Sequence, residues 1–288
     1  MNRISRPAPG LEQFVRYYVT RQMRIPGASM VHPVTARAVP TIEFDFGEPI
    51  TAFYCGRLEM RKSPRVIVVG PQTHRRVDLQ LHGALESFNI MFQPDGLYRL
   101  FSIPMYELVD EDYEGHAALG AFISGAYQRL GECDSFEARV RFMDEALLRR
   151  AIAAPTYNAI SAAANRVLST GGGVSIAALA GHAGLSMRQF ERKFIQQVGM
   201  RPKLFERIAR FEAALDGKAR FSAKSWTDVA HQFGYYDQMH MVHDFAEFTS
   251  ETPTKTLTQL ELVFGERIST VRSDSSCEPN GGNSRIFF

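Results

Sequence analysis

Apolar and polar residues alternate along several short segments in the first third of the chain. The segments TIEFDF (41–46) and VDLQL (77–81) show this period of two most clearly, and it is typical of half-buried β-strands. Turn-forming residues such as Gly70-Pro71 separate the segments. We predict a small sandwich or barrel with strands at 41–46, 51–55, 66–69, 77–81 and 85–92. Its core is expected to contain Phe44, Phe46, Phe53, Tyr54, Phe88 and Phe92.

Near residue 119 the apolar period becomes that of an α-helix. Six residues follow i, i+3, i+4 spacing up to Gly131 and predict one helix, namely Leu119, Phe122, Ile123, Ala126, Tyr127 and Leu130. A second helix is expected after Ser135, with one face formed by Phe136, Val140, Met143, Leu147 and Leu148. Pro155 ends this segment. We expect both helices to pack on the strands, and they also offer a face for a homodimer.

From Thr156 onward the pattern is helical and contains an internal repeat. Ala180 and Gly184 recur as Ala230 and Gly234, at an offset of 50 residues. Two helices that cross through a short turn need a small side chain at their closest approach and a residue that tolerates positive φ in the turn. Each copy supplies both, so the repeat predicts two helix-turn-helix units. Second helices capped by Ser186 and Asp237 are expected, and Ser225 begins a capping box.

In a helix-turn-helix the second helix enters the major groove of DNA and its exposed face reads base edges. In the first unit Phe190 and Phe194 are expected to face inward, and in the second unit Met241 and Phe245. The outward side chains of the first unit suit guanine, adenine and cytosine edges. The candidate contacts are Ser186, Met187, Arg188, Gln189, Glu191 and Arg192 in the first unit, and Gln238, Met239, Val242 and His243 in the second.

The charge distribution agrees with a nucleic-acid partner for the first unit. The whole chain of 288 residues has a net charge of only +2, and residues 1–155 carry 18 basic and 18 acidic side chains. Residues 166–220 carry 10 basic and 4 acidic side chains, whereas residues 221–261 carry 2 basic and 6 acidic ones. The resulting net charges of +6 and −4 place the attraction for phosphates in one short segment. Arg201 and Lys203, at a helix start, are expected either to cap the helix or to contact phosphate.

The stretches GHAGLSMRQFERKFIQQVGMRP (181–202) and SWTDVAHQFGYYDQMHMVHDFAEFTSETP (225–253) resemble the DNA-binding domain of the AraC/XylS transcriptional regulators. The resemblance implies a long helix, roughly 203–218, between the two units, and contacts with two successive major grooves. It also implies a sensing domain in the first half, where the segment 92–101 resembles a stretch of one such group. In this family the second unit usually carries basic residues where His243, Ala246 and Glu247 stand, and glycine where Ser250 stands. We therefore expect asymmetric DNA binding.

Two other classes of function compete with this interpretation. One is a metal-binding or small-molecule-binding β-barrel enzyme with a DNA-binding appendage, for which His32, His74 and His82 are the candidate ligands. These histidines lack the spacing of a metal site, and no motif for a nucleophile or a nucleotide-binding loop is present. Cys55 is expected in the core, and Trp226 is expected to pack rather than stack on a base. The other class is an architectural DNA-binding protein that senses nothing.

We therefore predict an α+β protein that is not an enzyme and uses no cofactor or metal. An N-terminal β-rich, cupin-like domain with appended helices (1–155) senses an effector or mediates association. An all-α DNA-binding domain (156–270) and a flexible tail (271–288) follow it. The expected partners are promoter DNA, a small-molecule effector, a second copy of the chain and, for an activator, RNA polymerase. The three widely spaced cysteines and the absence of a signal sequence or a span-length apolar run favour a cytoplasmic protein without a membrane partner.

Overall fold

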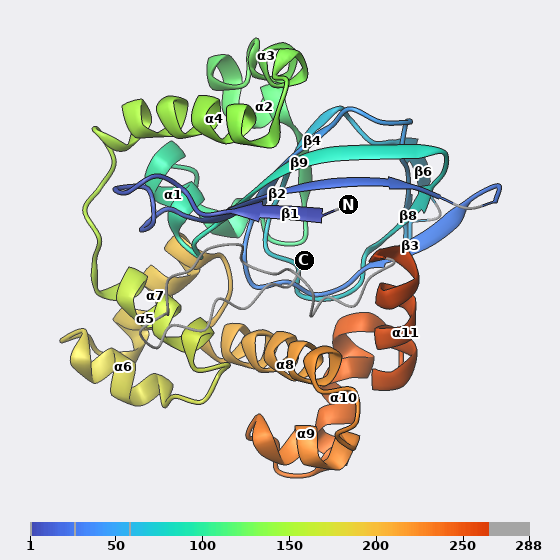
Figure 1. Ribbon diagram of the computed structural model, residues 1–288. Coiled ribbons are helices and arrows are strands. Elements are labelled where there is room, and N and C mark those ends of the chain that lie inside the picture. The colour runs from blue at the N-terminus through green and yellow to red at the C-terminus, as the bar shows by residue number, and fades with distance from the viewer. Residues whose placement is uncertain (1, 26, 58, 265–288) are drawn as a thin grey trace, which may run out of the picture.

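The computed structural model describes residues 2–25, 27–57 and 59–264. Its strands form two antiparallel sheets that face each other in the first part of the chain (Figure 1). The larger sheet has the order β1 (Asn2–Ser5), β2 (Val15–Arg24), β9 (Ala84–Phe92), β4 (Thr41–Asp45), β7 (Val66–Val69) and β10 (Asp112–Glu114). The smaller sheet has the order β3 (Met30–Val34), β8 (Val77–Leu81), β5 (Thr51–Tyr54) and β6 (Glu59–Lys62).

Helices complete this β-rich domain, and the last of them in chain order lie over the outer face of its larger sheet (Figure 1). They are α1 (Gly96–Phe101), η1 (Met105–Glu107), α2 (Gly115–Leu119), η2 (Gly120–Phe122), α3 (Ala126–Glu132) and α4 (Phe136–Ala151). Apolar side chains of α1 to α4 and of strands β2, β4, β7 and β9 form one buried cluster. Ser135 caps α4 by accepting a hydrogen bond from the Ala138 amide.

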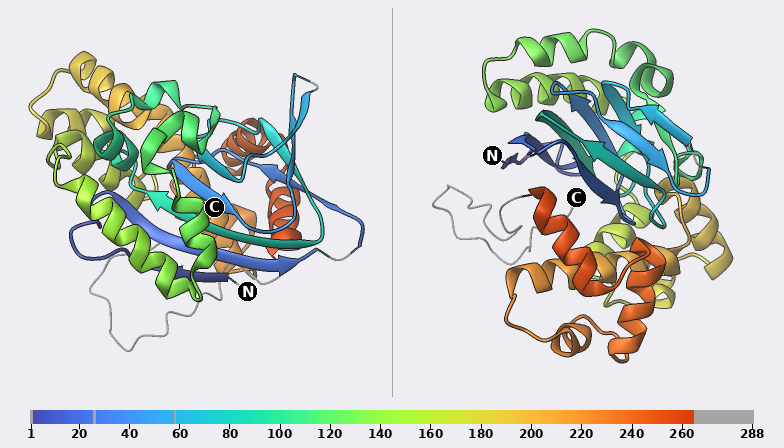
Figure 2. Two further views of the ribbon diagram at one scale, coloured as in Figure 1. Left: turned by 90° about the horizontal axis from the view of Figure 1, so that it is seen from above. Right: turned by 90° about the vertical axis from the view of Figure 1, so that its right-hand side faces the viewer.

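The C-terminal part is helical. It consists of α5 (Ala159–Ser169), α6 (Ile176–His182), α7 (Met187–Val198), α8 (Pro202–Arg220), α9 (Trp226–Gln232), α10 (Gln238–Thr249) and α11 (Pro253–Phe264). Helix α8 lies beneath the β-sandwich and joins the pair α6–α7 to the pair α9–α10 (Figures 1 and 2). None of the helices in the described part of the chain is long and apolar enough to cross a membrane.

The predicted fold class and the five predicted strands are confirmed, but several details were wrong. The helix predicted over 119–130 is broken into α2, η2 and α3, because Gly120 and Gly125 adopt positive φ. Strands β1, β2, β3, β6 and β10 were missed, because their residues carry no clear alternation. The predicted division near residue 155 falls in the connection between α4 and α5 and stays a prediction. The predicted tail (271–288) lies outside the described residues.

Three side chains expected in the interior lie at the surface instead. Phe53 is 40% exposed because it points away from the space between the sheets, whereas its neighbours Ala52 and Tyr54 are buried. Cys55 follows β5 in an exposed turn. Leu148 is exposed on α4, while the other four residues of its predicted face are buried. Phe53 and Leu148 each lie one position away from the buried face of their element, and Cys55 lies beyond the end of β5.

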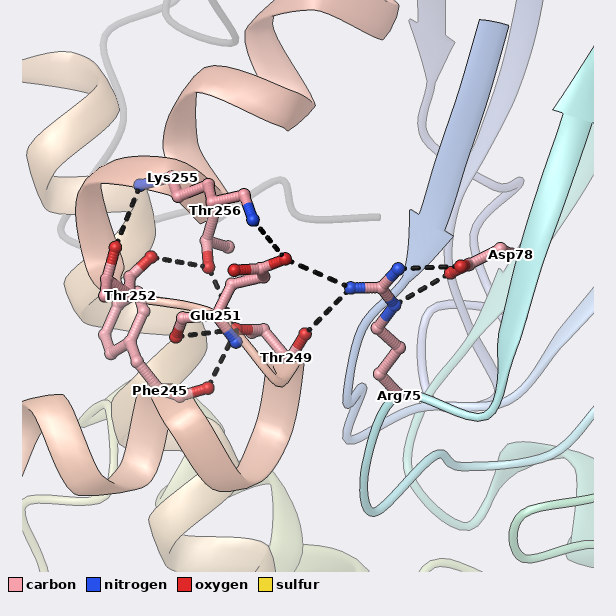
Figure 3. A network of polar contacts seen from close by, with 8 residues as sticks. All are labelled: Arg75, Asp78, Phe245, Thr249, Glu251, Thr252, Lys255 and Thr256. Carbon is pink, nitrogen blue, oxygen red and sulfur yellow. Dashed lines mark hydrogen bonds and ion pairs between the residues drawn. The ribbon is translucent and has the colours of Figure 1, made fainter. Parts of the chain in front are cut away.

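The two parts of the chain share one apolar core. Buried residues of β2 and of the segment 36–39 belong to the same cluster as buried residues of α5, α7, α8, α10 and α11. Polar contacts border this core. The Ala36 amide donates to the Phe248 carbonyl (3.0 Å), and the Ala38 amide donates to Glu212 Oε1 of α8 (3.2 Å). Arg75 holds Asp78 with two 2.7 Å hydrogen bonds and reaches the Thr249 carbonyl and Glu251 at the end of α10 (Figure 3).

A second set of polar contacts fixes the start of the helical part. The side chain of Arg99 is fully buried in α1 and donates hydrogen bonds to the Pro155 carbonyl at 2.9 and 3.1 Å. The same guanidinium donates to the Gln13 carbonyl and to Gln13 Oε1. Asp95, also fully buried, accepts a short hydrogen bond from Ser161 of α5. Both residues lie in the segment 92–101 that the sequence singled out, so this segment fastens the β-rich part to the helices that follow.

We predict that Arg99→Met lowers the free energy of unfolding by about 3–5 kcal/mol, because it leaves Asp95 and several carbonyl groups buried without their charged partner. Urea denaturation followed by circular dichroism measures the change. Arg129→Met is the matched control, because Arg129 is an exposed arginine on α3. Its effect should stay within about 0.5 kcal/mol. Equal effects of the two substitutions would contradict the role given to Arg99.

Candidate nucleic-acid interface

The first helix-turn-helix unit is formed by α6 and α7. Gly184 adopts a φ of 64° in the turn, and Ala180 is buried where the helices approach. Ser186 caps α7 in a capping box, in which the Gln189 amide donates to Ser186 Oγ (3.3 Å) and Gln189 Oε1 accepts from the Ser186 amide (3.0 Å). Phe190 and Phe194 are fully buried, as predicted, so the opposite face of α7 is fixed toward the outside.

The outward face of α7 carries the predicted contacts of the first unit. Met187, Arg188, Glu191 and Arg192 are all exposed. Gln189 is exposed too, but its side-chain carbonyl accepts hydrogen bonds from both the amide and the hydroxyl of Ser186. Its amide group is therefore the part that can face a ligand, while Ser186 itself is a capping residue.

The second unit repeats this geometry in α9 and α10. Gly234 has a φ of 73°, Ser225 forms a capping box with Asp228, and Asp237 caps α10 by accepting from the His240 amide. Met241 and Phe245 are buried, as predicted. Trp226 packs edge-on against Phe245 and donates its indole N–H to Thr254 Oγ1 (2.9 Å), which confirms a packing role. Ser250 takes the left-handed position after α10, with a φ of 60°, where glycine would be unstrained.

The outward face of α10 has no basic side chain besides histidine. Gln238, Met239 and His243 are exposed, and Val242 is half-buried. The side-chain oxygen of Gln238 accepts from Thr227 Oγ1 (2.7 Å), which ties α10 to α9. The sequence prediction missed Tyr236, which lies in the turn of this unit and is 88% exposed. A large exposed aromatic side chain at this point is a further candidate contact.

Ion pairs increase the difference in available positive charge between the two units. Arg188, Arg192, Lys193 and Arg201, on α7 and just after it, form no ion pair within the described part of the chain. On α8, by contrast, Lys203 and Arg210 both pair with Glu206, at 2.8 and 2.5 Å. Four cations on or just after α7 thus have no ion-pair partner among the described residues. Lys203 is less available for phosphate than Arg201, whose side chain makes no capping hydrogen bond.

Arg207 links α8 to the second unit, and its charge is neutralised by two carboxylates of that unit. Its guanidinium donates to Asp244 Oδ1 (2.6 and 3.1 Å) and to both carboxylate oxygens of Glu247 (2.6 and 3.1 Å). These hydrogen bonds to Glu247 and Asp244 raise the pKa of Arg207. Glu247, which stands where a basic residue is usual, is thus one partner of an ion pair that fixes α10 on α8.

A shallow groove runs between α7 and the β-rich domain. It is lined by Tyr106, Arg188, Glu191, Arg192, Ile195, Gln196 and Arg201. Tyr106 belongs to η1, and the remaining residues belong to α7 or to the start of α8. No pattern in the sequence pointed to Tyr106, because η1 comes close to α7 only through the packing of the two domains.

A cavity lies between the two sheets and is closed on one side by the helical domain. Its lining includes Arg21, His32, Arg37, Glu43, Asp45 and Gln72 from the β-rich domain, and Phe211, Glu212, Leu215 and Leu260 from α8 and α11. Its volume is about 130 Å³, which is room for roughly four water molecules at the ~30 Å³ that each takes up in the liquid. The cavity can therefore hold a small organic molecule.

The cavity wall is rich in buried charge. Arg37 bonds to Thr41 (3.2 Å) and lies 3.7 Å from Glu43. Burial raises the pKa of Glu212 to about 7 and that of Asp45 to about 7, and burial lowers the pKa of His32 to about 3. At neutral pH His32 is uncharged, and the two carboxyl groups are poised between their protonated and ionised forms.

No group of three or more His, Cys, Asp or Glu side chains in the described residues could hold a metal ion. His32 lines the cavity, whereas the exposed His74 bonds to Thr73 Oγ1 (3.0 Å). The free Cys55 and Cys133 lie in different parts of the β-rich domain, on the turn after β5 and at the end of α3. Cys277 lies outside the described residues.

Two family models match separate parts of the chain. Residues 179–259 match the family described as a helix-turn-helix domain, and residues 3–114 match a domain of unknown function, DUF6597. Among curated proteins none matches the chain.

Comparison with solved structures finds similarity to ToxT from Vibrio cholerae O395. It is 12% identical to this chain, with a TM-score of 0.48, over 84% of this chain and 98% of ToxT. ToxT of strain SCE256 bound to an unsaturated fatty acid is 9% identical, with a TM-score of 0.47, over 84% of this chain and 95% of that one. The AraC-like transcriptional activator CuxR is 12% identical, with a TM-score of 0.24, over 72% of this chain and 84% of CuxR.

We predict that Glu212→Gln removes a pH-dependent part of the stability. Between pH 4.5 and 7 native Glu212 keeps a proton that the unfolded chain has lost, so its contribution to stability falls as the pH rises through this range. The side-chain carbonyl oxygen of glutamine can still accept the hydrogen bond from the Ala38 amide, but the glutamine side chain does not titrate. The unfolding free energy of the variant relative to wild type should therefore rise between pH 5 and 8, by about 1–3 kcal/mol.

Urea titrations at pH 5, 6, 7 and 8 measure this difference. Glu145→Gln, at an exposed position of α4, is the control and should give a difference that does not change with pH. If the difference in unfolding free energy between Glu212→Gln and wild type also does not change with pH, the raised pKa of Glu212 is contradicted.

Proposed function

Because the chain carries a helix-turn-helix domain of the AraC family, we propose that it is a transcriptional regulator that reads two successive major grooves of promoter DNA and responds to an effector. The observation that carries the proposal is the duplicated unit itself. Two helices, α7 and α10, each begin at a side-chain cap and each bury one apolar face, and the long helix α8 lies between the two units. Each helix leaves its other face outside, which is the arrangement that a groove-reading helix needs.

In this proposal α7 provides most of the binding energy. Arg188, Glu191, Arg192 and the amide group of Gln189 read base edges in one groove. Gln238, Met239, Val242 and His243 of α10 make weaker contacts in the next groove. Arg201 fixes the position of the domain on phosphates, and Lys203 contributes less because of its ion pair with Glu206.

We predict that Arg192→Ala weakens binding to a specific duplex by about 1–3 kcal/mol, because a lost arginine–guanine pair costs this much. His243→Ala should cost clearly less. Fluorescence anisotropy with a duplex selected by the wild-type protein from a random library measures both. Arg129→Ala, on α3 of the β-rich domain, is the matched control and should bind as wild type does. Equal losses for Arg192→Ala and His243→Ala would contradict the asymmetry.

We place the effector in the cavity between the sheets. A ligand there would touch Glu212, Phe211 and Leu215 of α8 at the same time as the sheets. Helix α8 joins the two units, so a ligand that prefers one arrangement of α8 changes the affinity for DNA. Contacts with RNA polymerase and a homodimer through the outer helices of the β-rich domain complete the proposal.

We predict that Ala52→Phe abolishes the response to the effector while leaving DNA binding within about twofold of wild type. Ala52 is buried in the cavity wall on β5, and a phenyl ring there would fill the space. The measurement is a thermal-shift screen of small acids, amines, sugars and polyols, followed by anisotropy with each hit. Ala117→Phe on the exposed surface of α2 is the control. A hit that stabilises wild type and Ala52→Phe equally would place the effector elsewhere.

A further inference from the structure

The groove between η1 and α7 brings a residue of the β-rich domain to the candidate DNA-reading surface. Tyr106 is 53% exposed, although its neighbour Met105 is completely buried. It lies in one groove with Arg188, Arg192 and Arg201. Its hydroxyl group forms no hydrogen bond with any described residue. The hydroxyl group is therefore free to bind a ligand that enters the groove beside the three arginines.

The position of Tyr106 is fixed by close backbone packing on both sides of η1. At Gly199, which ends α7 with a φ of 99°, an added Cβ would lie 2.9 Å from the Met105 carbonyl oxygen and 2.6 Å from Val109 Cγ2. At Gly70 an added Cβ would overlap with the Leu108 carbonyl. Two glycines thus let the chain around η1 come against α7 and β7. Tyr106 is held at the groove by the backbone.

The groove has the charge and the donors that a phosphate needs. Three arginines against Glu191 give it a formal net charge of +2. None of these arginines forms an ion pair within the described part of the chain. The groove extends past the middle of α7 to Arg201 at the start of α8. When the first turns of a helix read bases, its later turns lie nearer the rim of the groove, where the DNA backbone runs.

We infer that Tyr106 is a DNA contact supplied by the β-rich domain. Its hydroxyl group donates a hydrogen bond to a backbone phosphate that Arg201 also approaches. This inference rests on the proposed function, because it requires that α7 enters a major groove. It adds that the N-terminal domain touches the DNA directly, so that any movement of this domain relative to α7 changes the affinity.

The test uses the full chain and two duplexes of equal length, one selected by the wild-type protein and one of random sequence. Fluorescence anisotropy at several salt concentrations gives the affinity and the slope of log K against log salt. Tyr106→Phe removes only the hydroxyl group and should weaken binding about 2- to 10-fold on both duplexes, with unchanged specificity. The salt slope should not change, because a neutral phenol releases no counterion. Arg201→Gln should reduce the slope by about 0.9.

Tyr157→Phe is the matched control, because Tyr157 is similarly exposed but lies outside the groove, before α5. It should bind as wild type does. Wild-type affinity for Tyr106→Phe would overturn the inference, as would tighter binding by Tyr106→Ala, which would mean that η1 obstructs the DNA. A wild-type protein that does not prefer the selected duplex, or an Arg192→Ala variant that binds normally, would overturn the proposed function and the inference with it.

Discussion

The apolar core that runs from the β-sandwich into the helical domain is the constraint on which the rest of the structure depends. Strand β2 and the segment 36–39 bury side chains in the same cluster as α8, α10 and α11. A large apolar contact of this kind favours one arrangement of two domains over many. The buried side chains of Arg99 and Asp95 fix the chain where it leaves the β-rich part. Both helix-turn-helix units are therefore held by the domain that contains the cavity.

The two units differ in how their charged side chains are paired. The cations of α8 are mostly neutralised within the helical domain, by Glu206, Asp216, Asp244 and Glu247, whereas those around α7 face solvent without a partner in the described chain. The acidic residues of the second unit thus have a structural role besides lowering its net charge. Its carboxylates Asp244 and Glu247 hold α10 on α8 through Arg207. In the proposed function the attraction for phosphates therefore comes from the first unit.

The sequence predicted what depends on local pattern. The caps at Ser186, Ser225 and Asp237, the turn glycines and the inward phenylalanines all follow from residue type and spacing, and the structure confirms them. The sequence could not predict features that arise when distant segments meet. The cavity joins Arg37 to Glu212, and the groove joins Tyr106 to Arg192, across more than 80 residues of chain in each case. The roles of the reading residues in binding DNA stay predictions.

The central claim is that α7 and α10 occupy successive major grooves with unequal strength. Dimethyl sulfate protection, which reports access to guanine N7 in the major groove, tests it directly on a bound duplex. We predict two protected regions on one face of the DNA, about 10 base pairs apart, with stronger protection in the one contacted by α7. Protection in a single region, or of equal strength in both regions, would contradict the account.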